Sequence, residues 1–144
     1  MNEQITRFKG KNSFLSNFYY SPVYYNGIIF ATVEQAFQAA KSNDLKTQKL
    51  FALAPTPGEA KSYGKQIKLR EDWELVKVSI MKDLLKQKFS KSPLKEMLLE
   101  TNTKELIEGN NHGDTYWGIV NGKGENMLGK LLMEVRSELQ HDFN

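Results

Sequence analysis

The sequence contains no cysteine and only two histidines, and both facts restrict its chemistry. Without cysteine the chain has no disulfide, no thiolate nucleophile and no cysteine-based zinc or iron–sulfur site. His112 and His141 stand far apart in the sequence, which is not the clustered pattern of a histidine metal site. We therefore expect a site that uses neither a metal nor another cofactor.

Long apolar runs are also missing. No stretch approaches the roughly 20 apolar residues that cross a bilayer, and the N-terminal residues lack the apolar core of a secretion signal. We expect no membrane association and a cytoplasmic location. The formal net charge of +3 over 144 residues is a mild basic bias. It suits a phosphate-bearing ligand but is weak support for a nucleic-acid groove.

The length and the apolar pattern predict one compact α+β domain over residues 1–144, mostly helical with a few short strands. Two β-prone runs around Asn26-Gly27 are typical of a hairpin with a two-residue turn. Caps, prolines at helix starts and three- to four-residue apolar spacing indicate the helices. The predicted helices cover residues 33–41, 45–54, 57–65, 73–89, 93–99 and 128–140, and the predicted strands outside the hairpin cover residues 5–8 and 106–108.

Two groups of side chains have a structural interpretation. The aromatic residues between positions 14 and 20 are expected to be core and surface aromatics rather than a base-stacking platform. Asn17 stands polar among them and is a candidate for binding substrate. A lysine-rich stretch further along the chain is expected to form a solvated surface: Lys86, Lys88, Lys91 and Lys95.

Residues 32–41, TVEQAFQAAK, carry the first functional signal. Thr32 and Gln35 have the spacing of a capping box, which predicts a helix that begins at the next residue after the threonine. Glu34, Gln38 and Lys41 follow at i, i+4 and i+7, so a carboxylate, an amide and an amine share one stripe of a mostly apolar helix. A stripe of this kind is more often a solvated face, and only further residues can favour a site.

Residues 110–130, NNHGDTYWGIVNGKGENMLGK, carry the second signal. The stretch is rich in glycine and has no helical periodicity, so it predicts a long structured loop, which is commonly functional. Asp114 and Trp117 lie within it. An aspartate after a glycine is also a common turn residue, and a large aromatic residue is often part of a core. His112 is expected to be a loop residue.

Part of this loop, GENMLGK, has the glycine and lysine spacing of a phosphate-binding P-loop. The match is weak, because Leu131 replaces the hydroxyl residue that would bind magnesium and no hydrophobic strand precedes the motif. We retain the physical part of the idea. Glycine amides and the start of the following helix can hold one phosphate or a similar anion, which makes Gly118, Gly124 and Asn126 candidates for binding substrate.

Five blocks of the sequence occur in the order FLSNFYYSPV, TVEQAFQAAK, LREDWELVK, NNHGDTYWG and GKGENMLGKLLMEVR. In this order they resemble the NADAR family, also called YbiA-like, over nearly the whole chain. The resemblance implies a small, mostly helical α+β domain and an activity that cleaves N-glycosidic bonds. One branch of the family removes ribose phosphate from early intermediates of riboflavin biosynthesis. Another removes ADP-ribose attached to guanine bases.

The resemblance also implies roles for individual residues. Glu34, Asp114 and Trp117 match the catalytic positions, and Trp73 is a further candidate for binding substrate, together with Gln38 on the Glu34 stripe. Lys41 matches a motif lysine for which covalent participation through an imine is discussed. Phosphate binding is the alternative role for this lysine.

The chemistry of the reaction is consistent with these residues. Cleavage of a C1′–N bond builds positive charge on the ribose, so a carboxylate near C1′ helps most. At about 4 Å and an effective dielectric near 20 it contributes roughly 4 kcal/mol, which corresponds to a rate factor on the order of 10³. Two carboxylates permit a division of labour, one that stabilises charge or activates water and one that acts as an acid. Glu34 and Asp114 are the predicted pair, and Trp117 is expected to stack on the sugar or the leaving base.

Two functions from different classes follow. The first is a hydrolase that cleaves the N-glycosidic bond between a ribose phosphate or ADP-ribose moiety and a base or an amine. Its partner would be a small phosphoribosyl or ADP-ribosyl substrate, or ADP-ribosylated guanine in nucleic acid. The alternative is a module that binds ADP-ribose or a related nucleotide without turnover.

Overall fold

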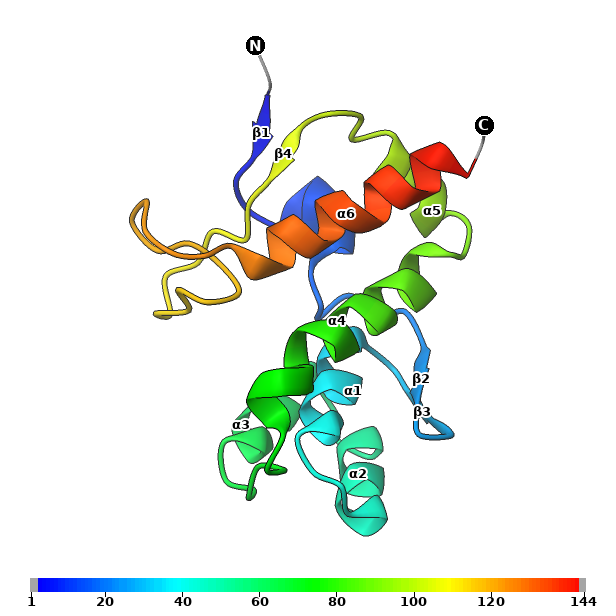
Figure 1. The fold of residues 1–144 in the computed structure, drawn as a ribbon, viewed down its shortest axis with the longest axis vertical. Coiled ribbons are helices and arrows are strands. Elements are labelled where there is room, and N and C mark those ends of the chain that lie inside the picture. Colours follow the sequence, from blue (N-terminus) through cyan, green and yellow to red (C-terminus); the bar gives the residue numbers. More distant parts are fainter. Residues whose placement is uncertain (1–2, 143–144) are drawn as a thin grey trace. The chain divides into compact units, whose positions relative to one another are not determined.

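The computed structural model describes residues 3–142, which form six α-helices, one 3₁₀ helix and four short strands (Figure 1). This content confirms the predicted α+β class with dominant helices. The chain divides into two units of dense internal contact, one formed by residues 17–88 and one formed by residues 1–16 together with residues 89–144. Within the described residues, no helix combines the length and the apolar character that a membrane crossing requires.

The hairpin of the unit formed by residues 17–88 has the predicted turn. Strands β2 (Val23–Tyr25) and β3 (Ile28–Phe30) pair antiparallel, with Val23 opposite Phe30. Asn26 and Gly27 between them have φ angles of 51° and 76°. A two-residue type I′ turn requires positive φ at both central positions, which explains the Asn-Gly pair.

Helix α1 (Val33–Ala40) lies at the centre of this unit, and all 8 of its residues are buried. It contacts α2 (Leu45–Ala52), α3 (Pro57–Gly64) and both strands of the hairpin (Figure 1). The predicted cap is confirmed, because Thr32 Oγ1 accepts a hydrogen bond from the amide of Gln35 at 3.1 Å. The side chain of Gln35 then donates to the carbonyl of Ala54 at 3.0 Å, which fixes the segment after α2 against α1.

Helix α4 (Trp73–Phe89) begins at the predicted residue. The carboxylate of Asp72, just before it, binds Arg70. The backbone carbonyl of Asp72 accepts from Val76, whereas the carboxylate binds the guanidinium of Arg70 through two bonds of 2.6 and 3.1 Å. Arg70 also donates from its backbone to the carbonyl of Lys41 at 2.7 Å and from Nη1 to the hydroxyl of Tyr25 at 3.1 Å. Arg70 therefore connects the hairpin, the end of α1 and the start of α4.

The unit that contains both ends of the chain has a two-stranded parallel sheet. Strand β1 (Gln4–Ile5) pairs with β4 (Glu105–Leu106), and both strands are shorter than predicted. The 3₁₀ helix η1 (Gly10–Leu15), α5 (Leu94–Leu99) and α6 (Met127–His141) complete the unit. Helix α6 contacts both β4 and α5, and its buried side chains include Leu128, Leu131, Leu132 and Val135.

Helix α5 begins at Leu94, one residue later than predicted. Pro93 occupies the capping position rather than the first helical position. The hydroxyl of Ser92 donates to the carboxylate of Glu96 at 3.0 Å, and no side-chain hydrogen bond caps this helix. A serine followed by proline therefore marks the start of the helix correctly here, although the serine does not supply the cap.

The prediction that Lys88 belongs to a solvated surface is wrong. Lys86 and Lys91 are exposed, but the exposed fraction of Lys88 is 0%. Lys88 shares a face of α4 with Leu84 and Met81, which are also buried, because residues three, four and seven positions apart lie on one side of a helix.

The buried amine of Lys88 has an aromatic neighbour. Its Nζ lies 5.6 Å from the centre of the Tyr19 ring, within the range of a cation–π contact. Burial nevertheless disfavours the charged form of the amine and lowers the pKa of Lys88 to about 7. The amine therefore titrates near neutral pH in the folded protein and near its ordinary pKa after unfolding.

Replacement of Lys88 by methionine should change how the free energy of unfolding depends on pH. Between about pH 7 and the ordinary lysine pKa, the unfolded state binds a proton at Lys88 that the folded state lacks, so the stability of the natural protein rises with pH. Methionine removes this contribution. Chemical denaturation at pH 7 and pH 9.5 should show a rise that is about 3 kcal/mol larger in the natural protein than in Lys88→Met.

The exposed Lys86 provides the matched control on the same helix. Lys86→Met should retain the pH dependence of the natural protein. Equal pH dependence in Lys88→Met and Lys86→Met would contradict the buried state of Lys88.

Candidate active site

Glu34 is a buried carboxylate in the first turn of α1, with an exposed fraction of 8%. Its Oε2 accepts a hydrogen bond from Nε2 of Gln38, one turn later, at 2.6 Å. Its backbone amide donates to the carbonyl of Asn17 at 3.1 Å. The stripe predicted from the sequence is therefore part of the interior of its unit and not a solvated face. A carboxylate buried in this way is costly without a function or a set of partners.

Two buried amide oxygens beside Glu34 lack a hydrogen-bond donor. Asn17 Oδ1 and Gln38 Oε1 belong to side chains that are 8% and 4% exposed, and neither oxygen accepts a hydrogen bond from the described residues. The other end of the Asn17 amide donates to the sulfur of Met81 at 3.6 Å. An unsatisfied buried acceptor costs about 1–3 kcal/mol, so native proteins keep few of them without a reason.

Gly64, the last residue of α3, allows that helix to approach α1 at Gln38. A Cβ at position 64 would overlap Oε1 of the Gln38 side chain. Because glycine leaves this space, the backbone of α3 packs directly on the amide that binds Glu34. The end of α3 thereby forms one side of the Glu34 cluster.

Lys41 follows α1 and is half-buried beside this cluster. Burial lowers the pKa of the Lys41 amine below its ordinary value, the Glu34 carboxylate raises it, and the amines of Lys61 and Lys65 lower it further. The lowered pKa increases the share of neutral amine, which is the nucleophilic form. The structure therefore places a carboxylate, an amide and an amine of unusual basicity in one region of the unit, as the sequence predicted.

Two aromatic residues border the cluster. The buried ring of Trp73 packs against Phe37 of α1, with ring centres 5.0 Å apart. Phe18, next to Asn17, is 43% exposed, and Nζ of Lys61 lies 6.0 Å from the centre of its ring. Trp73 thus occupies a core position, and its predicted contact with substrate stays a prediction.

Asp114 organises the long loop of the other unit. Its Oδ1 accepts hydrogen bonds from the amides of Tyr116 at 3.2 Å and Trp117 at 2.9 Å. The side chain of Asn110 accepts from the Asp114 amide at 3.1 Å and donates to the Asp114 carbonyl at 2.9 Å. The half-buried ring of Trp117 packs edge-on against Tyr116, with ring centres 5.0 Å apart. One carboxylate oxygen of Asp114 therefore serves the turn, as the structural interpretation expected, and His112 is an exposed loop residue.

The start of α6 already uses the amides that the predicted phosphate site requires. The amides of Glu125, Asn126, Met127 and Leu128 donate to the carbonyls of Thr115, Gly118, Tyr116 and Trp117, respectively, in the loop. These four amides are thus not available to an anion in this structure. Carbonyls of the loop take the place that a phosphate occupies in a P-loop.

The three residues predicted to bind substrate in this segment have close contacts within the unit. Asn126 Oδ1 accepts from the amide of Glu108 at 3.0 Å and its Nδ2 donates to the carbonyl of Leu106 at 2.9 Å. A Cβ at Gly118 would overlap the carbonyl of Glu108, and a Cβ at Gly124 would overlap the carbonyl of Gly118. These close approaches of the backbone explain why positions 118 and 124 are glycine. The two hydrogen bonds of its side chain explain the asparagine at position 126.

The predicted residues are divided between the two units. Asn17, Glu34, Gln38, Lys41 and Trp73 belong to residues 17–88, whereas Asp114, Trp117, Gly118, Gly124 and Asn126 belong to the other unit. The structure brings together Glu34, Gln38 and Asn17, with Lys41 beside them. The pairing of Glu34 with Asp114 stays a prediction.

Sequence reasoning missed Lys61 and Lys65 as neighbours of Lys41. Their spacing of four residues around Gly64 in a predicted helix is visible in the sequence. The sequence does not show that this helix packs on α1, and that contact is what makes the two lysines part of the cluster.

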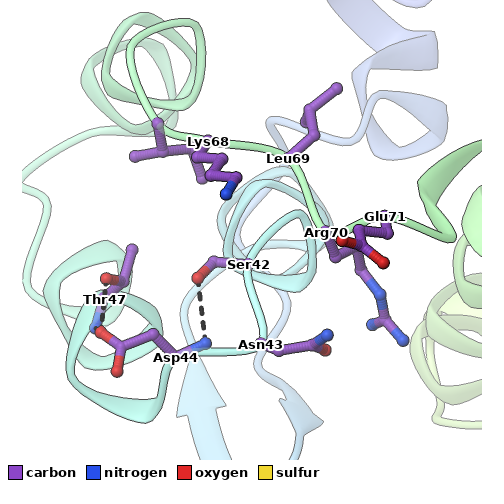
Figure 2. Close-up of a pocket in the computed structure, with 9 residues that line it drawn as sticks. Ser42, Asn43, Asp44, Thr47, Lys68, Leu69, Arg70 and Glu71 are labelled. Carbon is purple, nitrogen blue, oxygen red and sulfur yellow. Dashed lines mark hydrogen bonds between the residues drawn. The ribbon is translucent and has the colours of Figure 1, made fainter.

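A separate pocket of about 490 Å³ opens beside the end of α1 (Figure 2). Residues 42–44, Thr47 and residues 67–71 line it, and none of the residues predicted to act on substrate is among them. The hydroxyl of Ser42 accepts from the amide of Asp44 at 3.0 Å, and the carboxylate of Asp44 accepts from the amide and hydroxyl of Thr47. These groups stabilise the start of α2.

Comparison with known proteins adds the family relationship. The model of the NADAR domain matches residues 6–140. The chain is 38% identical over 133 residues to the N-glycosidase Npun_R5314 of Nostoc punctiforme, covering 88% of this chain and 85% of the relative. It is 34% identical over 133 residues to the riboflavin biosynthesis protein VVA0006 of Vibrio vulnificus, covering 90% of this chain but 36% of that protein.

A solved structure shows the same fold. The NMR structure of YbiA from Escherichia coli matches with a TM-score of 0.85 and 35% sequence identity, covering 99% of this chain and 88% of that chain. The family model, the relatives and this structure agree with the five ordered blocks of the sequence. The chain belongs to the NADAR family.

Proposed function

We propose that this protein hydrolyses the N-glycosidic bond between a ribose phosphate or ADP-ribose moiety and a base or an amine. The observation that carries the proposal is the buried carboxylate of Glu34, held by Gln38 and accompanied by the amine of Lys41. The reaction class is supported by the relative of similar length that is named an N-glycosidase. As a family member, the protein is an enzyme that acts on N-glycosyl compounds.

Glu34 is the group that stabilises the positive charge on the sugar. The hydrogen bond from Gln38 fixes one carboxylate oxygen, so the charge is held in place before the substrate arrives. Burial excludes water that would weaken the attraction between this carboxylate and C1′. The unpaired acceptors of Asn17 and Gln38 are suited to the hydroxyl groups of the ribose.

Lys41 has two chemical roles open to it. As a cation it would bind phosphate. As a neutral amine it would attack C1′ and displace the base, whose nitrogen takes a proton. Opening of the C1′–O4′ bond, with a proton going to O4′, would convert the resulting glycosylamine into an imine, and water would then hydrolyse the imine to regenerate the amine. The lowered pKa of Lys41 makes the neutral amine more abundant than it is in an ordinary lysine, which favours the role as nucleophile.

The riboflavin branch has one specific point of support. A relative whose matched segment covers 90% of this chain is named a riboflavin biosynthesis protein, although the chain spans only 36% of it. The proposed first substrate is therefore a small phosphoribosyl amine, and ADP-ribose on guanine is the second class to assay. Asp114 and Trp117 are proposed to supply the second carboxylate and the stacking surface.

Replacement of Glu34 by glutamine tests the proposed function directly. Glutamine keeps an acceptor for Gln38 and removes the charge, so base release should fall by a factor on the order of 10³. Ligand affinity should stay within a few-fold of the natural protein. Mass spectrometry measures the rate of base release, and calorimetry measures the ligand affinity. A natural protein that binds ligands of both classes and releases no base would instead be a binding module.

Replacement of Gly64 by alanine tests whether Gln38 must hold Glu34. The added methyl displaces the end of the Gln38 side chain from its place beside Glu34, so kcat should fall about tenfold, which corresponds to about 1.4 kcal/mol. Stability should change little, because the atom that must move belongs to a flexible side chain. Gly58→Ala on the same helix is the control, since its Cβ would meet nothing closer than Thr56 Oγ1 at 3.9 Å. Equal kcat in Gly64→Ala and Gly58→Ala would contradict a role for Gln38 in catalysis.

Two replacements of Asp114 separate a catalytic charge from a turn. Asp114→Asn keeps an oxygen that can accept from Tyr116 and Trp117, whereas Asp114→Ala removes it. If the charge takes part in catalysis, Asp114→Asn loses most of its activity with an unchanged melting temperature. Asp114→Ala should in addition lose about 1–2 kcal/mol of stability. Full activity in Asp114→Asn would restrict Asp114 to the turn.

A further inference from the structure

Three successive carbonyls at the end of α1 accept hydrogen bonds from residues outside that helix. The carbonyl of Ala40 accepts from Nη1 of Arg70 at 3.4 Å, and the carbonyl of Lys41 accepts from the backbone amide of Arg70 at 2.7 Å. The carbonyl of Ser42 accepts from Nε2 of Gln48 at 2.7 Å. The last carbonyls of a helix have no partner within it, so donors from other segments satisfy them here. Arg70 and Gln48 thus bind the backbone on both sides of Lys41.

The side chain of Arg70 is itself fixed. Its Nε and Nη2 donate to the two carboxylate oxygens of Asp72 at 2.6 and 3.1 Å, and its Nη1 donates to the hydroxyl of Tyr25 at 3.1 Å. A two-bond pair of guanidinium and carboxylate sets orientation as well as position. The guanidinium also brings positive charge to the C-terminal end of α1, where the helix dipole favours a cation. The donor at the carbonyl of Ala40 therefore has little freedom to move.

Gln48 is held by the turn of the hairpin. Its side chain is 2% exposed, and its Oε1 accepts from Nδ2 of Asn26 at 2.9 Å. Both ends of the buried amide are thus bonded, one to the turn and one to the carbonyl of Ser42. Rotation of this amide would leave buried polar atoms without partners, which costs about 1–3 kcal/mol for each. The hairpin therefore supports the end of α1 through Gln48 as well as through Tyr25 and Arg70.

The backbone of Lys41 decides where its side chain begins. Lys41 keeps helical dihedral angles, with φ −62° and ψ −20°, and its amide donates to the carbonyl of Gln38 at 3.2 Å. Seven residues make about two helical turns, so Lys41 leaves the helix on the side of Glu34. Gln38 lies between them on this side and binds Glu34. A shift of the backbone at the end of α1 would therefore move the Lys41 amine relative to Glu34.

We propose that Arg70 and Gln48 are positioning residues, which hold the backbone of Lys41 so that its amine meets the substrate beside Glu34. The inference rests on the proposed function, because it concerns a group of the same site. Arg70 and Gln48 act through Lys41 and not by contact with the substrate. Placement matters at this scale, because a misplacement of about 1 Å costs on the order of 10² in rate.

Two variants weaken these bonds while they keep the charge and the approximate size of the side chain. Arg70→Lys has no planar fork, so it cannot bind Asp72 through two bonds and also reach the carbonyl of Ala40. Gln48→Met removes the donor to the carbonyl of Ser42. Each variant should lower kcat/KM about tenfold for release of the base from a ribosyl amine 5′-phosphate.

Thr47→Val is the matched control on the helix that carries Gln48. The hydroxyl of Thr47 donates to the carboxylate of Asp44 at 2.7 Å, so this variant also removes a hydrogen bond close to the end of α1. That bond ends on a side chain and not on the backbone of residues 40–42. Thr47→Val should therefore keep kcat/KM within about twofold of the natural protein.

Asn26→Gly is a milder test of Gln48, for use if Gln48→Met does not fold. Glycine accepts the positive φ of 51° that the turn requires and removes the donor to Gln48. Loss of one hydrogen bond that holds the Gln48 amide should lower kcat/KM about threefold.

Acylation of Lys41 supplies a readout that does not depend on turnover. The reagent attacks the neutral amine, so the rate of labelling against pH, followed by mass spectrometry of peptides, gives a titration midpoint for this lysine. Burial is the largest cause of the lowered pKa of Lys41. In Arg70→Lys and Gln48→Met the amine should be better hydrated, so its midpoint should rise toward the ordinary value of a lysine. The labelling curve of the exposed Lys49, measured in the same sample, should not change.

The labelling and the turnover together separate the possible results. An unchanged midpoint of Lys41 in both variants overturns the positioning role, whatever happens to turnover. A raised midpoint with the kcat/KM of the natural protein overturns it too, because the reaction would then not depend on where Lys41 lies. If the midpoint rises and the natural protein releases no base from either substrate class, the proposed reaction fails, while the support of Lys41 by Arg70 and Gln48 stands.

Discussion

The burial of α1 on all sides is the constraint on which the rest of the site depends. Because every residue of this helix is buried, its polar side chains must find partners inside the unit. The Glu34 carboxylate accepts a hydrogen bond from Gln38, and the Glu34 amide donates one to the carbonyl of Asn17. The partnership is incomplete, since the amide oxygens of Asn17 and Gln38 remain without donors. A stability argument alone would favour apolar residues at these positions, which is why the proposed function assigns them to a polar ligand.

The elements around α1 hold its functional end in position from several directions. Gly64 lets α3 pack against Gln38, and Gln35 binds the segment after α2. Arg70 binds the carbonyl of Lys41 while its guanidinium is fixed by Asp72, whose pKa is lowered by the hydrogen bonds from Arg70. A catalytic group works best when its surroundings fix it before the substrate binds. The supporting contacts therefore explain why a small unit can keep a charged carboxylate and an amine side by side.

Local patterns predicted the local structure well. The Asn-Gly turn, the threonine caps and the helix that carries Glu34 follow from rules that involve neighbours in the sequence. What the sequence did not reveal depends on contacts between distant segments. Lys88 is buried because of the face of α4 on which it lies, and a lysine in a charged stretch gives no sign of this. Lys61 and Lys65 join the site only because α3 packs on α1. The amides at the start of α6 donate to carbonyls of the preceding loop, and comparison with the P-loop motif gives no sign of these contacts.

The central claim is that the sugar carbon of the substrate lies against the carboxylate of α1. A crystal structure of the Glu34→Gln variant with an intact phosphoribosyl amine tests it most directly. The account predicts C1′ within about 4 Å of the side chain at position 34, the distance at which one charge contributes several kcal/mol. It also predicts ribose hydroxyls within hydrogen-bond distance of Asn17 and Gln38. A substrate bound in the pocket beside Ser42, with both amide oxygens still unpartnered, would contradict the account.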